Sequence, residues 1–242
     1  MNVIITLMKT LQQWEQAVSI YDQNMGEEGD SFNKNSIGPA VLSMLGNYKN
    51  KTILDSGCGS GYFTAFLAGK AKNVTGTDFS QKFVDVCNKK YGKIKNLDFV
   101  LHDVSKKMPF QEGTFDIIIS KMVLQYVEDL NMFANESIRV LKKVGQLIVA
   151  VDHPFNTQFY YAQQVAGKPN PRYGVLNDYF DGRAHTKLSL WNKVMLTWYP
   201  KTMSGYITPF IKRGFSLVDI LESPEEKNNI RIPRVLTTKF KK

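Results

Sequence analysis

Residues 53–63 read Ile-Leu-Asp-Ser-Gly-Cys-Gly-Ser-Gly-Tyr-Phe, and this stretch decides the fold. Its apolar start predicts a short buried strand, its three alternating glycines predict a turn, and Tyr62 begins a helix. Glycine has no Cβ, so a ligand can lie directly against the backbone of such a turn. The stretch therefore predicts a strand–turn–helix unit whose turn holds a ligand.

Outward from this unit, short apolar runs alternate with helical segments. The strands that we expect are 52–54, 73–77, 97–101, 115–120 and 145–151. Short apolar strands flanked by turns are typical of a parallel sheet that is covered on both faces. Alternating strands and helices with right-handed crossovers predict a doubly wound α/β fold.

Three connecting segments have the pattern of helices: 62–71, 80–91 and 129–145. In the first, Phe63, Phe66 and Leu67 lie on one face. Ser80 is the predicted N-cap of the second. Gly145 is the predicted end of the third.

The chain is expected to be one domain, 1–242, with four parts. These are an N-terminal helical cap (1–36), a ligand-binding core (37–153), an aromatic-rich insertion after the fifth strand (154–205), and a closing helix and hairpin (206–242). Aromatic and apolar walls with few polar groups are typical of small-molecule pockets, so we expect the insertion to cap the substrate.

The net charge of +9 raises the question of a polyanionic partner. The lysines are scattered along the chain without a dense basic stripe, which favours an ordinary lysine-rich surface. A nucleic-acid partner is therefore left open but is not favoured. The sequence leaves the oligomeric state open.

Cysteine and histidine usage argues against a disulfide framework and against a metal site. Cys58 and Cys87 are the only cysteines, and His102, His153 and His185 show no ligand spacing. No apolar stretch approaches 18 residues, so we expect no membrane span. These features favour a reducing cytoplasm.

Acidic residues near the turn narrow the choice of ligand. Asp55 stands two residues before Gly57, where it would repel a diphosphate and attract an ammonium group. S-adenosylmethionine (SAM) carries an ammonium group and no phosphate. Asp78 follows Gly57 by 21 positions and ends the second strand. In nucleotide-binding α/β folds, a carboxylate at this position binds the ribose hydroxyls. Asp103, with the N–H of Val104, ends the third strand and suits an adenine edge.

The segment from Ser120 to Tyr126 follows the fourth strand. Ligands of open α/β sheets bind outside the carboxyl ends of the strands. We therefore expect Ser120 and its successors to border both cofactor and substrate; the alternative is that the apolar residues among them form helix core.

Five motifs in order carry a resemblance to a known family. They are Ile-Leu-Asp-x-Gly-Cys-Gly-x-Gly, Gly-Thr-Asp-Phe-Ser, His-Asp-Val with Met-Pro-Phe, Phe-Asp-Ile-Ile-Ile-Ser and Arg-Val-Leu-Lys-Lys-Val-Gly. The order resembles the class I SAM-dependent methyltransferases, and is most similar to the small-molecule branch called methyltransferase domain 11. The resemblance covers 37–153 and extends weakly to 205–242. It implies a Rossmann-like, seven-stranded sheet whose last strand is antiparallel.

The resemblance also implies roles at matching positions. Asp55 and Gly57 would contact the methionine end of SAM, and Cys58, Gly59 and Gly61 would form the turn beside it. Asp78 would bind the ribose hydroxyls. Phe79 would contact the adenine face, and Asp103 with Val104 the adenine edge. One departure is Gln125, where many relatives carry His. The Asn-Pro-Pro-Tyr signature of amino-methylating DNA enzymes is absent after Ser120.

Methyl transfer from SAM is an in-line displacement that depends mainly on positioning. His153, after the fifth strand, is the best candidate for a general base, and Tyr21 could close over SAM. The alternative for His153 is a structural role in the turn before Pro154. The alternative for Tyr21 is that its ring is part of the core. The predicted activity is methylation of a small, partly apolar acceptor, giving S-adenosylhomocysteine.

Three other functions stay open. An RNA or protein methyltransferase would suit the positive charge. A SAM-binding module without catalysis would share the same cofactor motifs. A nicotinamide-dependent oxidoreductase could use a similar glycine turn, but its diphosphate would lie close to Asp55.

Overall fold

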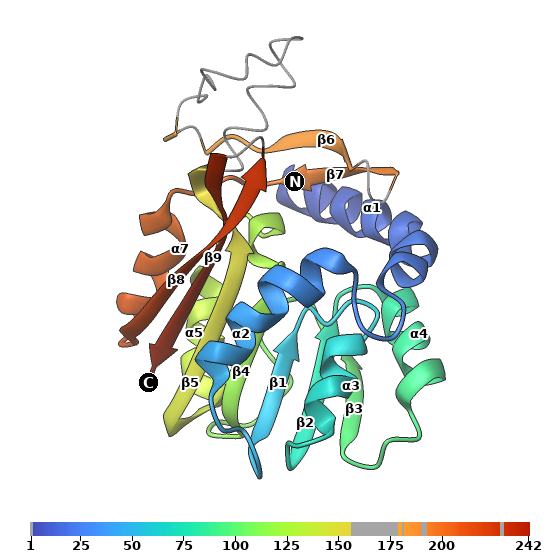
Figure 1. Ribbon diagram of the computed structural model, residues 1–242, viewed down its shortest axis with the longest axis vertical. Helices are drawn as coiled ribbons and strands as arrows, with labels where there is room; N and C mark the ends of the chain where they lie inside the picture. Colours follow the sequence, from blue (N-terminus) through green and yellow to red (C-terminus); the bar gives the residue numbers. More distant parts are fainter. Residues whose placement is uncertain (1, 156–178, 181, 190–192, 228–229) are drawn as a thin grey trace.

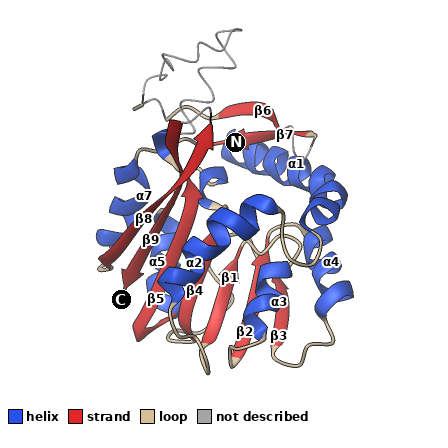
Figure 2. Ribbon diagram, viewed as in Figure 1, coloured by secondary structure: helices blue, strands red, loops and turns tan. Residues whose placement is uncertain are grey.

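The computed structural model describes residues 2–155, 179–180, 182–189, 193–227 and 230–242. Its centre is a seven-stranded sheet with the strand order β3-β2-β1-β4-β5-β9-β8, flanked by helices (Figures 1 and 2). The strands are β1 (Thr52–Ser56), β2 (Asn73–Asp78), β3 (Leu97–Leu101), β4 (Phe115–Lys121), β5 (Leu141–Asp152), β8 (Ser216–Lys227) and β9 (Ile230–Lys241).

Strands β3, β2, β1, β4 and β5 are parallel, and β9 pairs antiparallel with both β5 and β8. This arrangement confirms the expected Rossmann-like sheet whose last strand is antiparallel. Strand order reverses between β1 and β4, so the loops after β1 and β4 diverge at the carboxyl edge of the sheet. Ligands of open α/β sheets bind at such a switch point.

The helices and a second, two-stranded sheet complete the described fold. The helical segments are α1 (Asn2–Met25), a π-helix (Asn33–Ile37), α2 (Gly38–Leu45), α3 (Tyr62–Ala68), α4 (Gln81–Tyr91), a 3₁₀ turn (Leu124–Tyr126), α5 (Asn131–Val140) and α7 (Met203–Ile211). The small sheet pairs β6 (His185–Ser189) with β7 (Val194–Trp198). Figure 1 shows α1 beyond the carboxyl ends of the strands, with β6 and β7 next to it.

The core lies in two layers, one on each face of the sheet. Ile117 and Ile119 of β4 pack with α2 and α3, whereas Ile118 between them packs with α5 and α7. Successive strand residues point to opposite faces, so a strand that is apolar throughout serves both layers. Strand β5 does the same with Leu147 on one side and Ile148 on the other.

The predicted capping of the second connecting helix agrees with the structure. The Oγ of Ser80 accepts a hydrogen bond from the backbone N–H of Phe83 at 3.4 Å, and α4 begins at Gln81. A second cap forms at α7, where Thr202 Oγ1 accepts from Gly205 N at 3.0 Å.

The predicted end of the third connecting helix at Gly145 is wrong. Helix α5 ends at Val140, and Leu141 already has the extended backbone that begins β5. Leu141 is fully buried and pairs with Phe115 across a bulge, so packing overrides the helical pattern. Gly145 lies inside the strand, where a Cβ would be 2.8 Å from Leu141 Cδ2.

The three residues that were expected on one face of α3 differ in burial, because Phe66 is 53% exposed whereas Phe63 and Leu67 are buried. Helix α3 has seven residues, and Phe63 and Leu67 fill its core face. Phe66 instead stacks on Phe63 with ring centroids 6.1 Å apart. The closing strands β8 and β9 have 12 residues each.

The four-part division of the chain stays a prediction. Much of the 154–205 insertion (156–178, 181 and 190–192) lies outside the described residues. Its described remainder holds the small sheet, which the sequence did not predict. Trp198 of β7 packs beside Tyr126 with ring centroids 5.2 Å apart.

Candidate functional site

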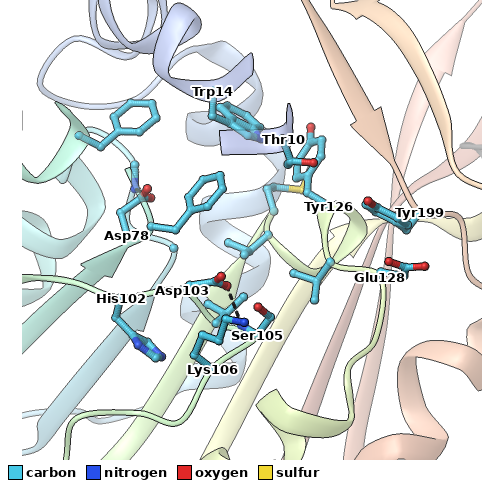
Figure 3. A pocket seen from close by; sticks show the side chains of 18 of the residues that line it. Thr10, Trp14, Asp78, His102, Asp103, Ser105, Lys106, Tyr126, Glu128 and Tyr199 are labelled. Carbon is cyan, nitrogen blue, oxygen red and sulfur yellow. Dashed lines mark hydrogen bonds between the residues drawn. The ribbon is translucent and has the colours of Figure 1, made fainter. Parts of the chain in front are cut away.

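A cavity of about 590 Å³ opens at the carboxyl edge of the sheet, beneath α1 (Figure 3). Its wall combines the glycine turn after β1, the ends of β2 and β3, the segment after β4, and α1. Because parallel strands bring their carboxyl ends to one edge, segments far apart in sequence meet here. This cavity has the size of a small-molecule site.

The glycine turn presents bare backbone to the cavity. Gly57 has φ +81°, and a Cβ on it would collide with the side chain of Val123. Gly59 has φ +54°, and its Cβ would lie 3.2 Å from the ring of Tyr21. The backbone N–H groups of Gly57 and Cys58 donate to Thr77 O at 2.7 and 2.8 Å, which ties the turn to β2. Only glycine at 57 fits both the backbone and the space.

Asp78, at the end of β2, joins the glycine turn to the cavity wall. One carboxylate oxygen accepts from Gly59 N and the other from Ser80 N, both at 3.0 Å. Burial raises the pKa of Asp78 to about 6, although these backbone hydrogen bonds oppose the shift. The carboxylate is thus fixed in place and strongly desolvated where a ligand would meet it.

Asp103 and Val104 lie on the cavity wall after β3, as Figure 3 shows for Asp103. The carboxylate of Asp103 accepts from Ser105 N at 2.8 Å, which holds the loop in a tight turn. Phe79 also lines the cavity. The structure therefore brings together six of the predicted cofactor residues: Gly57, Gly59, Asp78, Phe79, Asp103 and Val104.

Four predicted cofactor residues lie behind the cavity wall: Asp55, Cys58, Gly61 and Ser120. Asp55 is 2% exposed and accepts a hydrogen bond from Thr64 Oγ1 at 2.7 Å. Burial raises the pKa of Asp55, while Thr64 and the charge of Lys121 oppose the shift. Ser120 is fully buried in β4.

Tyr21 lies on the cavity wall, in an aromatic group that α1 forms with its neighbours. Trp14 meets Tyr21 and Tyr126 edge-on, with ring centroids 5.9 and 5.0 Å apart, and Phe83 meets Tyr21 at 5.2 Å. Burial, with the nearby charge of Asp78, raises the pKa of Tyr21 far above its usual value. Tyr21 therefore stays protonated near neutral pH and can donate a hydrogen bond but cannot serve as a base.

His153 lies outside the cavity wall, at the end of β5. Its Nδ1 accepts from Phe155 N at 3.2 Å, so Nε2 carries the proton and donates to Glu222 Oε1 at 2.7 Å. Burial lowers the pKa of His153, and Glu222 opposes the shift. The structure does not bring His153 together with the cavity-lining residues.

Lys121 lies in the segment after β4 that the sequence predicts to border the ligand, and it contributes a cation to the cavity wall. Its Nζ donates to Asn33 Oδ1 at 2.7 Å and to Tyr62 Oη at 2.6 Å. Burial lowers the pKa of Lys121 to about 8, against the attraction of Asp55 and Asp30. A lysine that follows Ser120 and a run of three isoleucines in the strand was the available signal, because a strand end at this edge faces the ligand.

The sequence reasoning passed over the opposite end of the cavity. Figure 3 shows Thr10, Glu128 and Tyr199 there, and His102 near Asp103. Lys201 lies beneath this end and donates to the backbone carbonyls of Val127 and Tyr199. Its buried amine thus ties the segment after β4 to the segment after β7.

No metal site and no membrane helix occur in the described parts of the chain. Among the residues that the structure places, no three His, Cys, Asp or Glu side chains form a group that could hold a metal ion. None of the described helices is both long and apolar enough to cross a bilayer.

Residues 54–149 match a family model described as a methyltransferase domain. The chain is 30% identical over 122 residues to a malonyl-[acyl-carrier protein] O-methyltransferase of Hamiltonella defensa, which covers 50% of this chain and 45% of that protein. It is 31% identical over 124 residues to a demethylmenaquinone methyltransferase of Tropheryma whipplei, which covers 50% of this chain and 51% of that protein. The chain thus spans about half the length of these curated relatives.

Solved structures show the same fold. A crystal structure of a putative S-adenosylmethionine dependent methyltransferase from Listeria monocytogenes aligns with a TM-score of 0.72 at 23% identity. The alignment covers 84% of this chain and 96% of that one. The matched residues 54–149 run from β1 into β5 and include the glycine turn, Asp78 and Asp103.

Proposed function

We propose that the chain transfers a methyl group from SAM to a small, partly apolar acceptor. The reason is that it belongs, through residues 54–149, to the class I SAM-dependent methyltransferases. The observation that carries the proposal is the joining of Asp78 to the glycine turn at the cavity wall. The products would be the methylated acceptor and S-adenosylhomocysteine.

The cavity residues fit SAM. Gly57 and Gly59 line the cavity with backbone alone, and Val123 and Tyr21 already occupy the positions where their Cβ atoms would lie. Asp78 offers a fixed carboxylate for the two ribose hydroxyls. Phe79 would contact the adenine face, and Asp103 with Val104 its edge. A volume of about 590 Å³ leaves room for cofactor and acceptor together.

Charge at the turn supports SAM over a nicotinamide cofactor. Asp55 lies directly beneath the turn, at the end of β1, and its carboxylate is 2% exposed. In a desolvated position a negative charge repels a diphosphate strongly and attracts an ammonium group. The ammonium group of SAM would therefore be favoured at this end of the cavity.

When bound, SAM supplies a methyl group on a positively charged sulfur. The chain's own residues would position the acceptor and exclude water. Trp14, Tyr21 and Tyr126 form a continuous aromatic wall over the turn. Such positioning contributes roughly 7–11 kcal/mol in well-oriented reactions. Tyr21, protonated and next to Gly59, would hold the cofactor rather than take a proton.

The acceptor is proposed from the cavity wall rather than from the relatives. Trp14, Tyr126, Val127 and Tyr199 are aromatic or apolar, with Glu128 near the same end. Such a wall favours a small, partly apolar molecule. His153 would have no direct part in the reaction, because its imidazole is hydrogen-bonded to Glu222 of β8. Its role would be to hold the end of β5 to β8. The two free, buried cysteines support a cytoplasmic location.

Calorimetry with SAM, S-adenosylhomocysteine and NAD tests the proposal. We expect both SAM compounds to bind and NAD not to bind. Binding of NAD without the SAM compounds would contradict the cofactor assignment. Turnover is then measured as S-adenosylhomocysteine formed with a panel of small acceptors. SAM binding without turnover on any acceptor would favour a non-catalytic binding module.

A further inference from the structure

Lys121 is a cation that the fold holds at the methionine end of the proposed cofactor site. It ends β4 and lines the cavity together with Gly57. An ammonium group has three N–H donors. Two of them go to Asn33 Oδ1 and Tyr62 Oη, so one donor is left for a ligand.

Two segments outside β4 fix the position of this ammonium group. Asn33, in the π-helix, is itself held by Asp30, whose Oδ1 accepts from both the backbone N–H and the side-chain amide of Asn33 at 2.8 Å. Tyr62 begins α3, and its hydroxyl donates to Asn33 Oδ1. The Lys121 Nζ lies 4.7 Å from the Tyr62 ring centroid and 4.9 Å from that of Phe63. The cation is therefore oriented before any ligand arrives.

The charge of Lys121 has no close partner among the described residues. None of the ion pairs within 4.0 Å in this part of the chain includes Lys121, and its two hydrogen-bond acceptors are both neutral. Asp55 and Asp30 attract it only from a greater distance. With a pKa of about 8, the amine is largely protonated at pH 7. A buried, oriented and unneutralised cation is suited to an anionic ligand group.

Lys121 places a positive charge on the cavity wall, and Asp55 places a carboxyl group behind the same wall. Asp55 is the next-to-last residue of β1, and Lys121 ends the adjacent β4. The charge of each opposes the pKa shift that burial causes in the other. The amino-acid end of SAM carries an ammonium and a carboxylate on the same carbon. Opposite charges on adjacent strands match that pair of groups.

We propose that Lys121, oriented by Asn33 and Tyr62, binds the α-carboxylate of the methionine portion of SAM. The inference rests on the proposed function and adds a subsite that reads the carboxylate. Asp55 attracts the α-ammonium from below the turn. An acceptor carboxylate is the other source of the same chemistry, and the experiment separates the two.

Decarboxylated SAM is the probe, because it lacks only the α-carboxylate. Calorimetry on the wild-type chain should show SAM binding at least tenfold tighter than decarboxylated SAM. In Lys121→Met, SAM should lose at least tenfold in affinity, and the two ligands should bind about equally. A tenfold loss corresponds to about 1.4 kcal/mol, and loss of a charge-assisted hydrogen bond is large enough to cause it.

Lys106→Met is the matched control. Lys106 lines the same cavity next to Ser105, at the predicted adenine end, and its side chain is exposed. This variant should keep the wild-type preference for SAM. If Lys121→Met does not fold by circular dichroism, Lys121→Gln, which keeps a donor without the charge, replaces it.

The outcomes separate the two proposals. If the wild-type chain binds neither SAM nor S-adenosylhomocysteine, the proposed function fails. If it binds SAM and decarboxylated SAM equally, or if the Lys121 variant keeps the preference, the subsite is wrong while the cofactor assignment stands. In that case an acceptor carboxylate becomes the ligand to test.

Discussion

The side chain of Val123 occupies the space into which a Cβ on Gly57 would point. Gly57 belongs to the turn after β1, and Val123 to the segment after β4. These are the two adjacent strands between which the strand order reverses. The two walls of the cavity therefore touch directly, and the contact requires a glycine.

Gly57→Ala should destabilise the fold and weaken cofactor binding. The left-handed backbone costs about 1–2 kcal/mol for a non-glycine residue. Overpacking against Val123 adds about 1–3 kcal/mol. Denaturant unfolding should give a loss of roughly 2–5 kcal/mol from these two terms, and SAM affinity should fall with it.

Gly113→Ala is the matched control, because Gly113 has φ +66° and nothing within 4 Å of its Cβ position. It should show the backbone cost alone. Val123→Ala in the Gly57→Ala background should recover part of the lost stability. Equal losses for the two single glycine variants would show that the Val123 contact contributes nothing.

The affinity for S-adenosylhomocysteine should depend on pH through Asp78. Ribose hydroxyls donate to the ionised carboxylate, so binding is full above the pKa of about 6 and falls as pH drops below it. Calorimetry at pH 7.5 and pH 5 should differ by about tenfold, as protonation of a group with that pKa requires.

Asp78→Asn should bind about 10- to 100-fold more weakly at pH 7.5, because a charged hydrogen-bond acceptor is lost. Its affinity should also change little between pH 5 and pH 7.5. A pH dependence that persists in this variant would belong to another cavity residue, with His102 the first candidate.

Arg139→Met should loosen the loop that follows Asp103. Arg139 donates to the carbonyls of Met108 and Phe110 and pairs with Glu136, which accepts from Met108 N at 2.8 Å. Removing the guanidinium leaves these groups unpaired and should cost about 2–4 kcal/mol of unfolding free energy.

The loss in Arg139→Met should shrink at acid pH. Arg139 holds the pKa of Glu136 below its usual value, so the pair stabilises the fold above that usual value and ceases to do so as pH falls through the lowered one. Arg213→Met is the control, since Arg213 bonds the exposed Asn135, and it should stay within about 0.5 kcal/mol of wild type. An equal loss in both variants would contradict a special role for Arg139.

His153→Ala should lower stability without lowering cofactor affinity. The variant loses the bonds to Glu222 and Phe155, at a cost of about 1–3 kcal/mol. Because burial lowers the pKa of His153, its stabilising effect is complete at neutral pH and declines as pH falls below the unfolded value. Thermal melts and calorimetry check this; a tenfold weaker SAM affinity would place His153 in the cofactor site after all.

Local patterns sufficed to predict the backbone side of the site. The positions of the glycine turn and of Asp78 can be predicted from where strands end and from the spacing between them, and both can be read from the sequence. The partners of Lys121 do not, because Asn33 is 88 residues away from it and Tyr62 is 59 residues away. No local pattern encodes such a meeting of three segments.

The errors have the same cause. A glycine at position 145 is typical of a helix end, but the strand β5 begins four residues earlier, where Leu141 pairs with Phe115. His153 was placed correctly at the end of β5, but its orientation depends on Glu222 in a strand 69 residues later. Sequence periodicity indicates which face is apolar and leaves such long-range pairing undetermined.

The place of β9 has a consequence for how the chain is made. β9 is synthesised after β8 yet lies between β5 and β8 in the sheet. Until residues 235–241 leave the ribosome, the edge of β5 in a growing chain is unpaired. During the same time β8 has no strand with which to pair. The β5–β9–β8 side of this sheet can therefore form only after β9 has been synthesised.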